Sequence, residues 1–259
     1  MSNFPCVILA GGLGTRLRES SEYKPKPMIE LDSKPILWHI LKSYNHYGVK
    51  DFIISSGYKS EYIKNYFLHY NSFNQDFKID LATNQVSYYG GTENWNVTVS
   101  DTGLNTMTGG RISRIRKYLT AESFFCTYGD GVSDINISEL LNFHKAHGKV
   151  ATMMVVRQPS RFGVVDLKDD SAVSSFREKP IVDGWVNAGY FIFNKQIFDY
   201  LNEDSILENE PLRNLASEGE LVAFKHEGYW QAMDTFREQQ LLEKLILEKK
   251  APWIKWDSQ

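Results

Sequence analysis

Three glycines and two cations near the amino terminus form the pattern with the clearest chemical meaning. Gly11, Gly12 and Gly14 directly follow an apolar run, and Arg16 and Lys26 come after them. Glycines let a loop bend so that several backbone N–H groups point at one anion, and the two cations bring full positive charge to the same place. The pattern therefore predicts a phosphate-binding loop at the end of a strand.

Two familiar phosphate-binding patterns do not fit this loop. A Walker loop ends in Gly-Lys-Ser or Gly-Lys-Thr, and the dinucleotide fingerprint needs a third glycine where this chain has Arg16 and Leu17. A simple tight turn remains the alternative for the glycines alone. Arg16, together with Lys26 between Pro25 and Pro27, favours binding over a mere turn.

The segments 11–17 and 25–27 resemble the signature of the sugar-1-phosphate nucleotidylyltransferases. That signature usually carries Pro and Thr shortly after its Arg-Leu pair, where this chain has Glu19 and Ser21. This difference turns attention to the cytidylyl branch, the glucose-1-phosphate cytidylyltransferases, which look similar along nearly the whole chain. The resemblance implies transfer of a cytidylyl group from CTP to α-D-glucose 1-phosphate, which gives CDP-glucose and pyrophosphate with Mg²⁺ as cofactor.

Two aspartates are the candidate metal ligands. Asp130 stands between two glycines directly after the apolar run 123–128, where a carboxylate can reach a metal ion. The alternative is an ordinary Asp-Gly turn. Asp234 resembles the family's second metal carboxylate, although it could simply begin the helix that Thr235 would cap. We expect Mg²⁺ on Asp130 and Asp234.

The resemblance also implies which residues contact the nucleotide. The turn at Thr108 and Arg111 is expected to face the base, because an arginine fork suits a pyrimidine carbonyl or a phosphate. The alternative is a plain helix start with threonine as its cap. Arg16 and Lys26 are the expected catalytic residues. The expected nucleotide-binding residues are Leu9, Ala10, Gly11, Gly12, Gly14, Thr15, Arg16, Lys26, Thr108, Arg111, Gly129 and Asp130.

A second group of residues resembles the family's sugar-phosphate half site. Glu178 and Lys179 precede a proline, and Asn187 follows a few residues later. Lysine before proline is also an ordinary surface pattern, so the order of these residues after the loop and Asp130 carries the argument. The expected sugar-phosphate residues are Gly163, Glu178, Lys179 and Asn187.

Strand and helix signals alternate along the chain. Repeated βα units imply right-handed crossovers and an α/β fold with a Rossmann-like, mostly parallel sheet flanked by helices. Ligands bind beyond the carboxyl ends of such strands. The expected strands are 6–10, 51–57, 79–82, 123–128, 150–156 and 221–224, and the expected helices start near Lys34, Glu61 and Thr106.

The segment 84–108 interrupts this alternation. Its runs 86–89 and 96–100, joined through Gly90 and Gly91, predict a β-hairpin or flap outside the main sheet. A small sugar-binding β region is expected in the second half of the chain. We expect one domain over 1–259, with a nucleotide-binding half (1–135) and a sugar-phosphate-binding half with a C-terminal helix (136–259).

Composition narrows the class of protein. The 259 residues carry a net charge of -3, so a general nucleic-acid or anionic-membrane surface is not expected. The chain has no long apolar span, and its two cysteines, Cys6 and Cys126, lie in apolar runs typical of buried thiols. We expect a cytoplasmic homo-oligomer. The aromatic segment 251–256 is expected to pack against another subunit or against its own core.

Two other functions remain open from the sequence. One is transfer of another nucleotide, or transfer to another sugar phosphate or small phosphorylated acceptor, since pocket shape decides the acceptor. The other is a non-catalytic nucleotide-sugar-binding regulatory protein on the same fold. Such a protein could lose Lys26 or a carboxylate without penalty, and this chain has them all.

Overall fold

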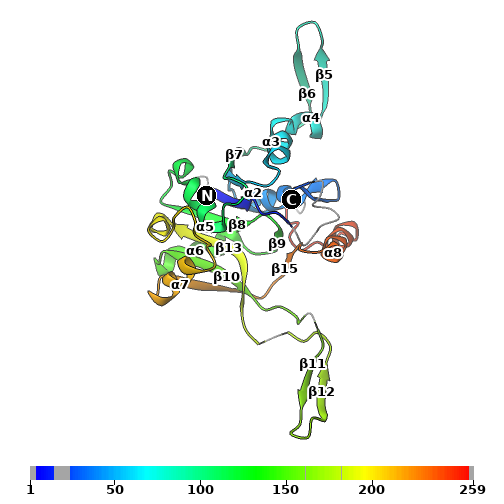
Figure 1. The fold of residues 1–259 in the computed structure, drawn as a ribbon. Coiled ribbons are helices and arrows are strands. Elements are labelled where there is room, and N and C mark those ends of the chain that lie inside the picture. Colours follow the sequence, from blue (N-terminus) through cyan, green and yellow to red (C-terminus); the bar gives the residue numbers. More distant parts are fainter. Residues whose placement is uncertain (1–3, 15–23, 161, 182, 257–259) are drawn as a thin grey trace.

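The centre of the molecule is a seven-stranded sheet with the order β14-β10-β13-β8-β1-β4-β7 (Figure 1). A computed structural model describes residues 4–14, 24–160, 162–181 and 183–256. Neighbouring strands are parallel except where β13 pairs with β8 and β10, so the predicted α/β, mostly parallel sheet is confirmed. The strands are β1 (Cys6–Ala10), β4 (Asp51–Ser56), β7 (Asn96–Asp101), β8 (Ser123–Tyr128), β10 (Ala151–Val156), β13 (Val186–Asn194) and β14 (Leu221–His226).

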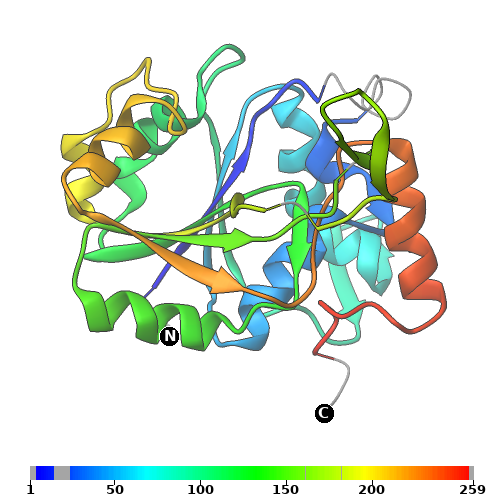
Figure 2. The same ribbon diagram turned by 90° about the horizontal axis from the view of Figure 1, so that it is seen from below.

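Helices cover both faces of this sheet (Figure 2). Side chains of α2, α6 and α8 join the core on one face, and side chains of α5 and α7 join the core on the other. Within the described ranges, no helix is long and apolar enough to span a membrane. The helices are α2 (Ile36–His46), α3 (Ser60–Leu68), α4 (Tyr70–Asn74), α5 (Thr108–Arg114), α6 (Ile137–His147), α7 (Glu210–Ser217) and α8 (Phe236–Leu247), with 3₁₀ turns η2 (Lys26–Met28), η3 (Arg116–Tyr118) and η4 (Lys195–Asp199).

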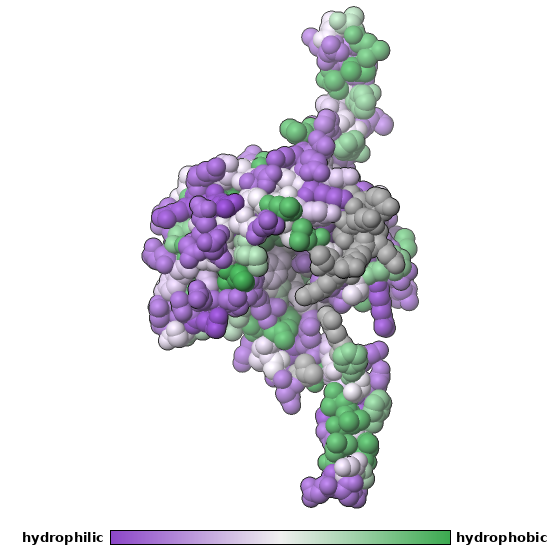
Figure 3. Space-filling view, in the orientation of Figure 1, coloured by the Kyte–Doolittle hydropathy of each residue, from purple (hydrophilic) through white to green (hydrophobic). Residues whose placement is uncertain are grey.

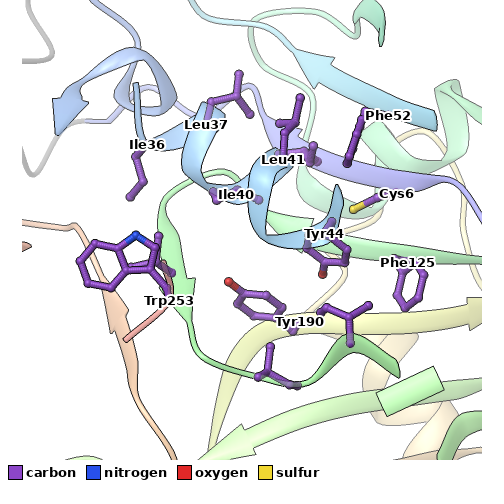
Figure 4. Close-up of a cluster of buried hydrophobic side chains, with 14 of the residues drawn as sticks. Cys6, Ile36, Leu37, Ile40, Leu41, Tyr44, Phe52, Phe125, Tyr190 and Trp253 are labelled. Carbon is purple, nitrogen blue, oxygen red and sulfur yellow. The ribbon is translucent and has the colours of Figure 1, made fainter. Parts of the chain in front are cut away.

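Alternation along the central strand explains why the core has two layers. Cys6, Ile8 and Ala10 of β1 face one layer, whereas Val7 and Leu9 face the other, as successive side chains on a strand must. All five are buried, which requires helices on both faces. Figure 4 shows the first layer, in which side chains of α2 pack against the sheet: Ile36, Leu37, Ile40, Leu41 and Tyr44.

Capping residues fix where two of the helices begin. The Asn136 side chain accepts hydrogen bonds from the N–H groups of Ser138 and Glu139 at the start of α6. Thr235 and Glu238 form a capping box at the start of α8, so the predicted role of Thr235 as a helix cap is confirmed. Each cap satisfies N–H groups of the first helical turn and so fixes the residue at which the helix begins.

The predicted hairpin within 84–108 is wrong, because the runs 86–89 and 96–100 do not pair with each other. Strand β6 (Gln85–Tyr89) pairs with β5 (Asp76–Asp80), and β7 joins the main sheet as a parallel neighbour of β4. The turn therefore lies at 81–84, where the Asp80 carboxylate accepts hydrogen bonds from the next N–H groups and Asn84 adopts a φ of 57°. The predicted strand 79–82 belongs to this ribbon, not to the main sheet.

Two β-ribbons project from opposite ends of the body (Figure 1). One is β5/β6, and the other is β11/β12, which lies in the second half of the chain where a small β region was expected. Two shorter pairs lie on the body beside the main sheet. The remaining strands are β2 (Glu30–Leu31), β3 (Lys34–Pro35), β9 (Gly131–Ser133), β11 (Val164–Leu167), β12 (Val173–Arg177) and β15 (Trp230–Ala232).

The aromatic carboxyl-terminal segment packs against its own chain. The Trp253 side chain is 1% exposed and stacks on Tyr229 with ring centroids 5.7 Å apart. We expect Trp253→Ala to lower the free energy of unfolding by about 3–5 kcal/mol, because it removes a large buried side chain and leaves a cavity. Urea denaturation would measure this. Leu247→Ala is the control, since Leu247 is 76% exposed, and equal losses in both variants would contradict the assignment.

Candidate active site

A cavity of about 710 Å³ opens at the carboxyl ends of the parallel strands. The loops that follow β1 and β8 form part of its wall, as expected for a sheet of this type. A side chain at Gly11 would displace the Arg111 guanidinium, since a Cβ there would lie 2.0 Å from it, and Gly14 has a φ of 64°. Two of the three glycines of the first loop therefore have a geometric cause, whereas a Cβ at Gly12 would meet no other atom within 4 Å.

An ion-pair cluster lies in this cavity. Lys26 Nζ donates hydrogen bonds to Asp130 Oδ2 and to Asp234 Oδ1, each at 2.6 Å. Burial lowers the pKa of Lys26, but the two carboxylates outweigh burial, and the pKa rises above its ordinary value. Lys26 therefore stays protonated, and one positive charge is held between two negative ones.

Strand pairing brings the two aspartates together from positions far apart in the sequence. Strand β9 pairs antiparallel with β15, with Gly131 opposite Ala232. Asp130 directly precedes β9, and Asp234 follows β15 two residues after Ala232. The N–H of Met233 donates to the Asp130 carbonyl at 2.8 Å, which extends the pairing to the aspartates. Both carboxylates consequently reach the same ammonium.

Backbone stiffness positions Lys26. Its segment begins with Pro25, and Pro27 lies inside the 3₁₀ turn η2, so two φ angles are fixed by proline rings. The N–H of Met28 closes the turn on the Pro25 carbonyl at 2.8 Å. Pro27 is buried beside Gly129, where an added Cβ would lie 3.2 Å from the proline ring. The lysine side chain thus leaves a rigid turn.

The Arg111 side chain ties together three loops at the cavity wall. Its NH1 donates to the carbonyls of Ser56 and Gly103 and to the Thr102 hydroxyl, and its NH2 donates to the Gly11 carbonyl at 2.8 Å. The side chain is buried. NH2 also donates to the Leu104 carbonyl at 3.3 Å. Arg111 lines the cavity, but these five bonds already occupy both terminal nitrogens of its fork.

The residues expected to bind a sugar phosphate lie in two places. Asn187 lines a smaller cavity of about 270 Å³ together with Asp130 and Asp234. Gly163, Glu178 and Lys179 lie at the ends of β11 and β12 on the projecting ribbon, where Lys179 Nζ pairs with Glu178 Oε1 at 3.4 Å. Among the described residues, those three line neither of the two cavities beside Asp130.

Comparisons with known proteins agree with this architecture. The sequence pattern named nucleotidyl transferase matches residues 6–239. The chain belongs to the nucleotidyl transferase family. It is 49% identical over 255 residues to a glucose-1-phosphate cytidylyltransferase of Salmonella typhimurium, with 97% of this chain and 99% of that protein covered. It is 40% identical over 252 residues to a probable glucose-1-phosphate cytidylyltransferase of Bacillus subtilis, with coverage of 96% and 99%.

A solved structure shares the fold of this nucleotidyl transferase. HddC from Yersinia pseudotuberculosis superposes with a TM-score of 0.69 at 26% identity, and the match covers 94% of this chain and 99% of that one. The match extends over nearly the whole chain, so the two proteins share their overall fold.

The cavity of this nucleotidyl transferase gathers most of the residues predicted from the sequence. Thr15 and Arg16 lie outside the described residues, so their positions are not described. Tyr128 and Glu208 also line the cavity and were missed, because neither belongs to a recognisable motif. The predicted residues on its wall are Leu9, Ala10, Gly11, Gly12, Gly14, Lys26, Thr108, Arg111, Gly129, Asp130 and Asp234.

The bonds of Arg111 predict a strong effect of a conservative substitution. Lysine has one ammonium in place of a planar fork, so Arg111→Lys cannot hold Gly11, Ser56 and Gly103 together. We expect the KM for the nucleoside triphosphate to rise roughly tenfold, since several hydrogen bonds of about 1 kcal/mol each are lost. Steady-state kinetics would measure this. An equal effect of Arg114→Lys, on the outer side of α5, would contradict a specific role.

Proposed function

We propose that this chain transfers a cytidylyl group from CTP to α-D-glucose 1-phosphate, giving CDP-glucose and pyrophosphate. The observation that carries the proposal is the convergence of Lys26, Asp130 and Asp234 beside the glycine loop. This arrangement combines cationic charge, carboxylates and backbone N–H groups, which phosphate chemistry needs. The close similarity to glucose-1-phosphate cytidylyltransferases supports the choice of substrates.

Charge explains why such a cluster is needed. CTP carries about four negative charges and a sugar phosphate about two, and two unit charges ~5 Å apart repel by roughly 3 kcal/mol at an effective dielectric near 20. We propose that Lys26 and Arg16 neutralise charge on the departing pyrophosphate, while the glycine loop donates backbone hydrogen bonds to the phosphates. These groups would let the two anionic substrates approach each other.

The residues present fit a divalent cation, which we propose is Mg²⁺. Asp130 and Asp234 already hold one positive charge between them, and each supplies hard oxygen ligands. Among the described residues there is no cluster of three or more His, Cys, Asp or Glu that could hold a metal. Mg²⁺ is commonly bound through one or two carboxylates plus substrate phosphates, so two aspartates suffice. When bound, the ion would neutralise phosphate charge.

The reaction then needs positioning more than covalent chemistry. A phosphate oxygen of glucose 1-phosphate attacks the α-phosphorus of CTP and forms a new P–O bond. The bond between the α-phosphorus and the α–β bridging oxygen breaks on the opposite side, and pyrophosphate leaves. We propose that Asn187, beside Asp130, orients the sugar phosphate, and that Gly163, Glu178 and Lys179 contribute from the ribbon. No protein nucleophile is required, because in-line positioning and charge stabilisation suffice for this transfer.

Pyrophosphate release tests the proposal directly. CTP, UTP, dTTP, ATP and GTP are each combined with glucose 1-phosphate and Mg²⁺, with acceptor-free controls. Release that depends on both CTP and glucose 1-phosphate is the expected result. Release with another base, or only with another phosphorylated acceptor, would overturn the substrate assignment and keep the nucleotidyl transfer. Binding of nucleotides without any turnover would instead favour a regulatory protein.

We also propose that the chain forms a homo-oligomer through its projecting ribbon β11/β12. Val165, Leu167, Val173 and Phe176 are each 48–63% exposed there, and Figure 3 shows apolar surface along this projection. Apolar surface of this extent is typical of protein–protein contacts. We expect light scattering to give a multiple of 29.8 kDa, and Phe176→Ser to reduce it. A measured mass equal to that of a single chain at micromolar concentration would contradict the proposed oligomer.

We propose the cytoplasm as the place of the reaction. The two cysteines, Cys6 and Cys126, carry free thiols in the core, as predicted, and free thiols fit a reducing compartment. The proposed partners are CTP and glucose 1-phosphate, and we propose no nucleic-acid or membrane partner.

A further inference from the structure

Glu208 is a carboxylate on the wall of the large cavity that the mechanism above does not use. It precedes α7 by two residues and lines the cavity together with Thr108 and Tyr128. Glu208 Oε2 accepts a hydrogen bond from the Thr108 hydroxyl at 2.6 Å, and Oε1 accepts one from the Tyr128 hydroxyl. The two donors come from different elements, α5 and β8, so the carboxylate is held from two sides.

Neighbouring contacts fix the direction of both donors. The N–H of Leu207 donates to the Thr108 hydroxyl oxygen at 2.9 Å, which leaves the Thr108 proton for Glu208. The Asn187 side-chain amide donates to the Tyr128 hydroxyl oxygen at 3.5 Å, which leaves the Tyr128 proton for Glu208. The N–H of Gly110 donates to the Ser205 carbonyl at 2.9 Å and ties α5 to the loop of Glu208. The carboxylate is preorganised before any ligand binds.

Glu208 is an exposed carboxylate without a cationic partner among the described residues. No lysine or arginine pairs with it there, whereas Lys26 faces both Asp130 and Asp234. A carboxylate repels a ligand with about four negative charges by Coulomb's law. It fits a nucleotide site only if it faces the nucleoside end and receives a hydrogen bond from it.

Glu208 is connected to the part of the wall that is expected to face the base. Its partner Thr108 belongs to the segment 104–108, which lines the same cavity as Lys26, Asp130 and the glycine loop. The carboxylate therefore lies next to the turn at Thr108 that the sequence assigns to the base. An ionised carboxylate accepts about four hydrogen bonds, and Thr108 and Tyr128 use two, so acceptor sites remain for a ligand.

We propose that Glu208 is a specificity-determining residue that accepts a hydrogen bond from the exocyclic amino group of cytosine. Cytosine presents an N–H donor where uracil and thymine present a carbonyl acceptor, and a carboxylate can pair only with the donor. A carbonyl oxygen facing Glu208 would leave both groups unsatisfied and repelling. The inference rests on the proposed function, because it assumes that CTP is the nucleotide substrate.

The test pairs a change in the protein with a change in the ligand. CTP, UTP and the pyrimidin-2-one ribonucleoside triphosphate, which lacks the amino group, are compared as substrates of the wild type, Glu208→Ala and Glu208→Gln. For the wild type we expect loss of the amino group to lower kcat/KM roughly tenfold to a hundredfold. In Glu208→Ala, loss of the amino group from the nucleotide should change kcat/KM by less than about threefold. The difference between the two proteins measures the coupling between Glu208 and the amino group, as in a double-mutant cycle.

Two comparisons separate specificity from a structural role. Glu208→Gln should improve UTP relative to CTP at least tenfold, because its amide N–H₂ can donate to the uracil carbonyl. Glu203→Ala removes a carboxylate from the same loop that pairs with Arg114 and does not line the cavity, so it should keep the wild-type ratio. Calorimetric binding of the three nucleotides without sugar phosphate gives the same comparison if turnover is low.

The outcomes distinguish this inference from the proposed function. A wild type without preference for CTP would overturn the base assignment itself. A wild type that prefers CTP, combined with an undiminished amino-group effect in Glu208→Ala, would overturn only the role of Glu208. Equal loss of all substrates in Glu208→Ala would also overturn it, because the residue would then have a structural role.

Discussion

Lys26→Ala is expected to lower kcat for nucleotidyl transfer by roughly a hundredfold to a thousandfold, the usual effect of removing one preorganised charge-stabilising donor. Lys26 leaves a turn fixed by two prolines, lies in the phosphate cavity and stays protonated because Asp130 and Asp234 raise its pKa. In the substrate complex its charge would lie beside the leaving pyrophosphate. Pyrophosphate release at saturating substrate would measure the change.

Two controls make this prediction specific. Lys24→Ala removes a lysine from the same Lys-Pro-Lys-Pro segment, but Lys24 pairs with the exposed Glu30, so its loss should leave kcat nearly unchanged. The raised pKa of Lys26 also means that its positive charge is complete at neutral pH and is lost only in strong alkali. Near-normal kcat in Lys26→Ala would remove this residue from the proposed chemistry.

Much of the fold could be predicted because most main-sheet strands are continuous apolar runs. Both faces of β1, β4 and β8 are buried, which leaves a clear signal in the sequence. The β5/β6 ribbon gives a weaker signal, because every residue of both strands is exposed and pairing depends on the turn at Asp80 and Asn84. The pair Gly90-Gly91 resembles a hairpin turn equally well in sequence, so the pairing was mispredicted.

The site was predictable where chemistry coincides with a strand end. Asp130 lies two residues after the end of β8, and Lys26 lies between two prolines, so both have local signals. The pairing of β9 with β15, which brings Asp234 to Lys26, cannot be read from either segment alone. Glu208 lies in a polar loop without a motif, and only the bonds from Thr108 and Tyr128 distinguish it from other surface glutamates.

Asp130→Asn and Asp234→Asn are each expected to lower kcat/KM by roughly a hundredfold and to raise the Mg²⁺ concentration for half-maximal rate by about tenfold or more. The physical reason is that each substitution removes one of the two negative charges that a divalent cation needs here, a change of several kcal/mol. Lys26 Nζ lies 2.6 Å from each carboxylate, so a cation that binds both must compete with it.

Because Mg²⁺ and Lys26 compete for the same carboxylates, the Mg²⁺ titration can distinguish a metal site from aspartates that only hold Lys26. With one carboxylate neutralised, Lys26 still pairs with the other, and added Mg²⁺ should restore only part of the rate. Asp169→Asn changes an exposed aspartate on the β11/β12 ribbon and should leave the Mg²⁺ titration unaltered. If both variants keep the wild-type Mg²⁺ response, the two-carboxylate metal site is wrong, and the aspartates serve only to hold Lys26. If just one does, the cation relies on a single aspartate and the phosphates.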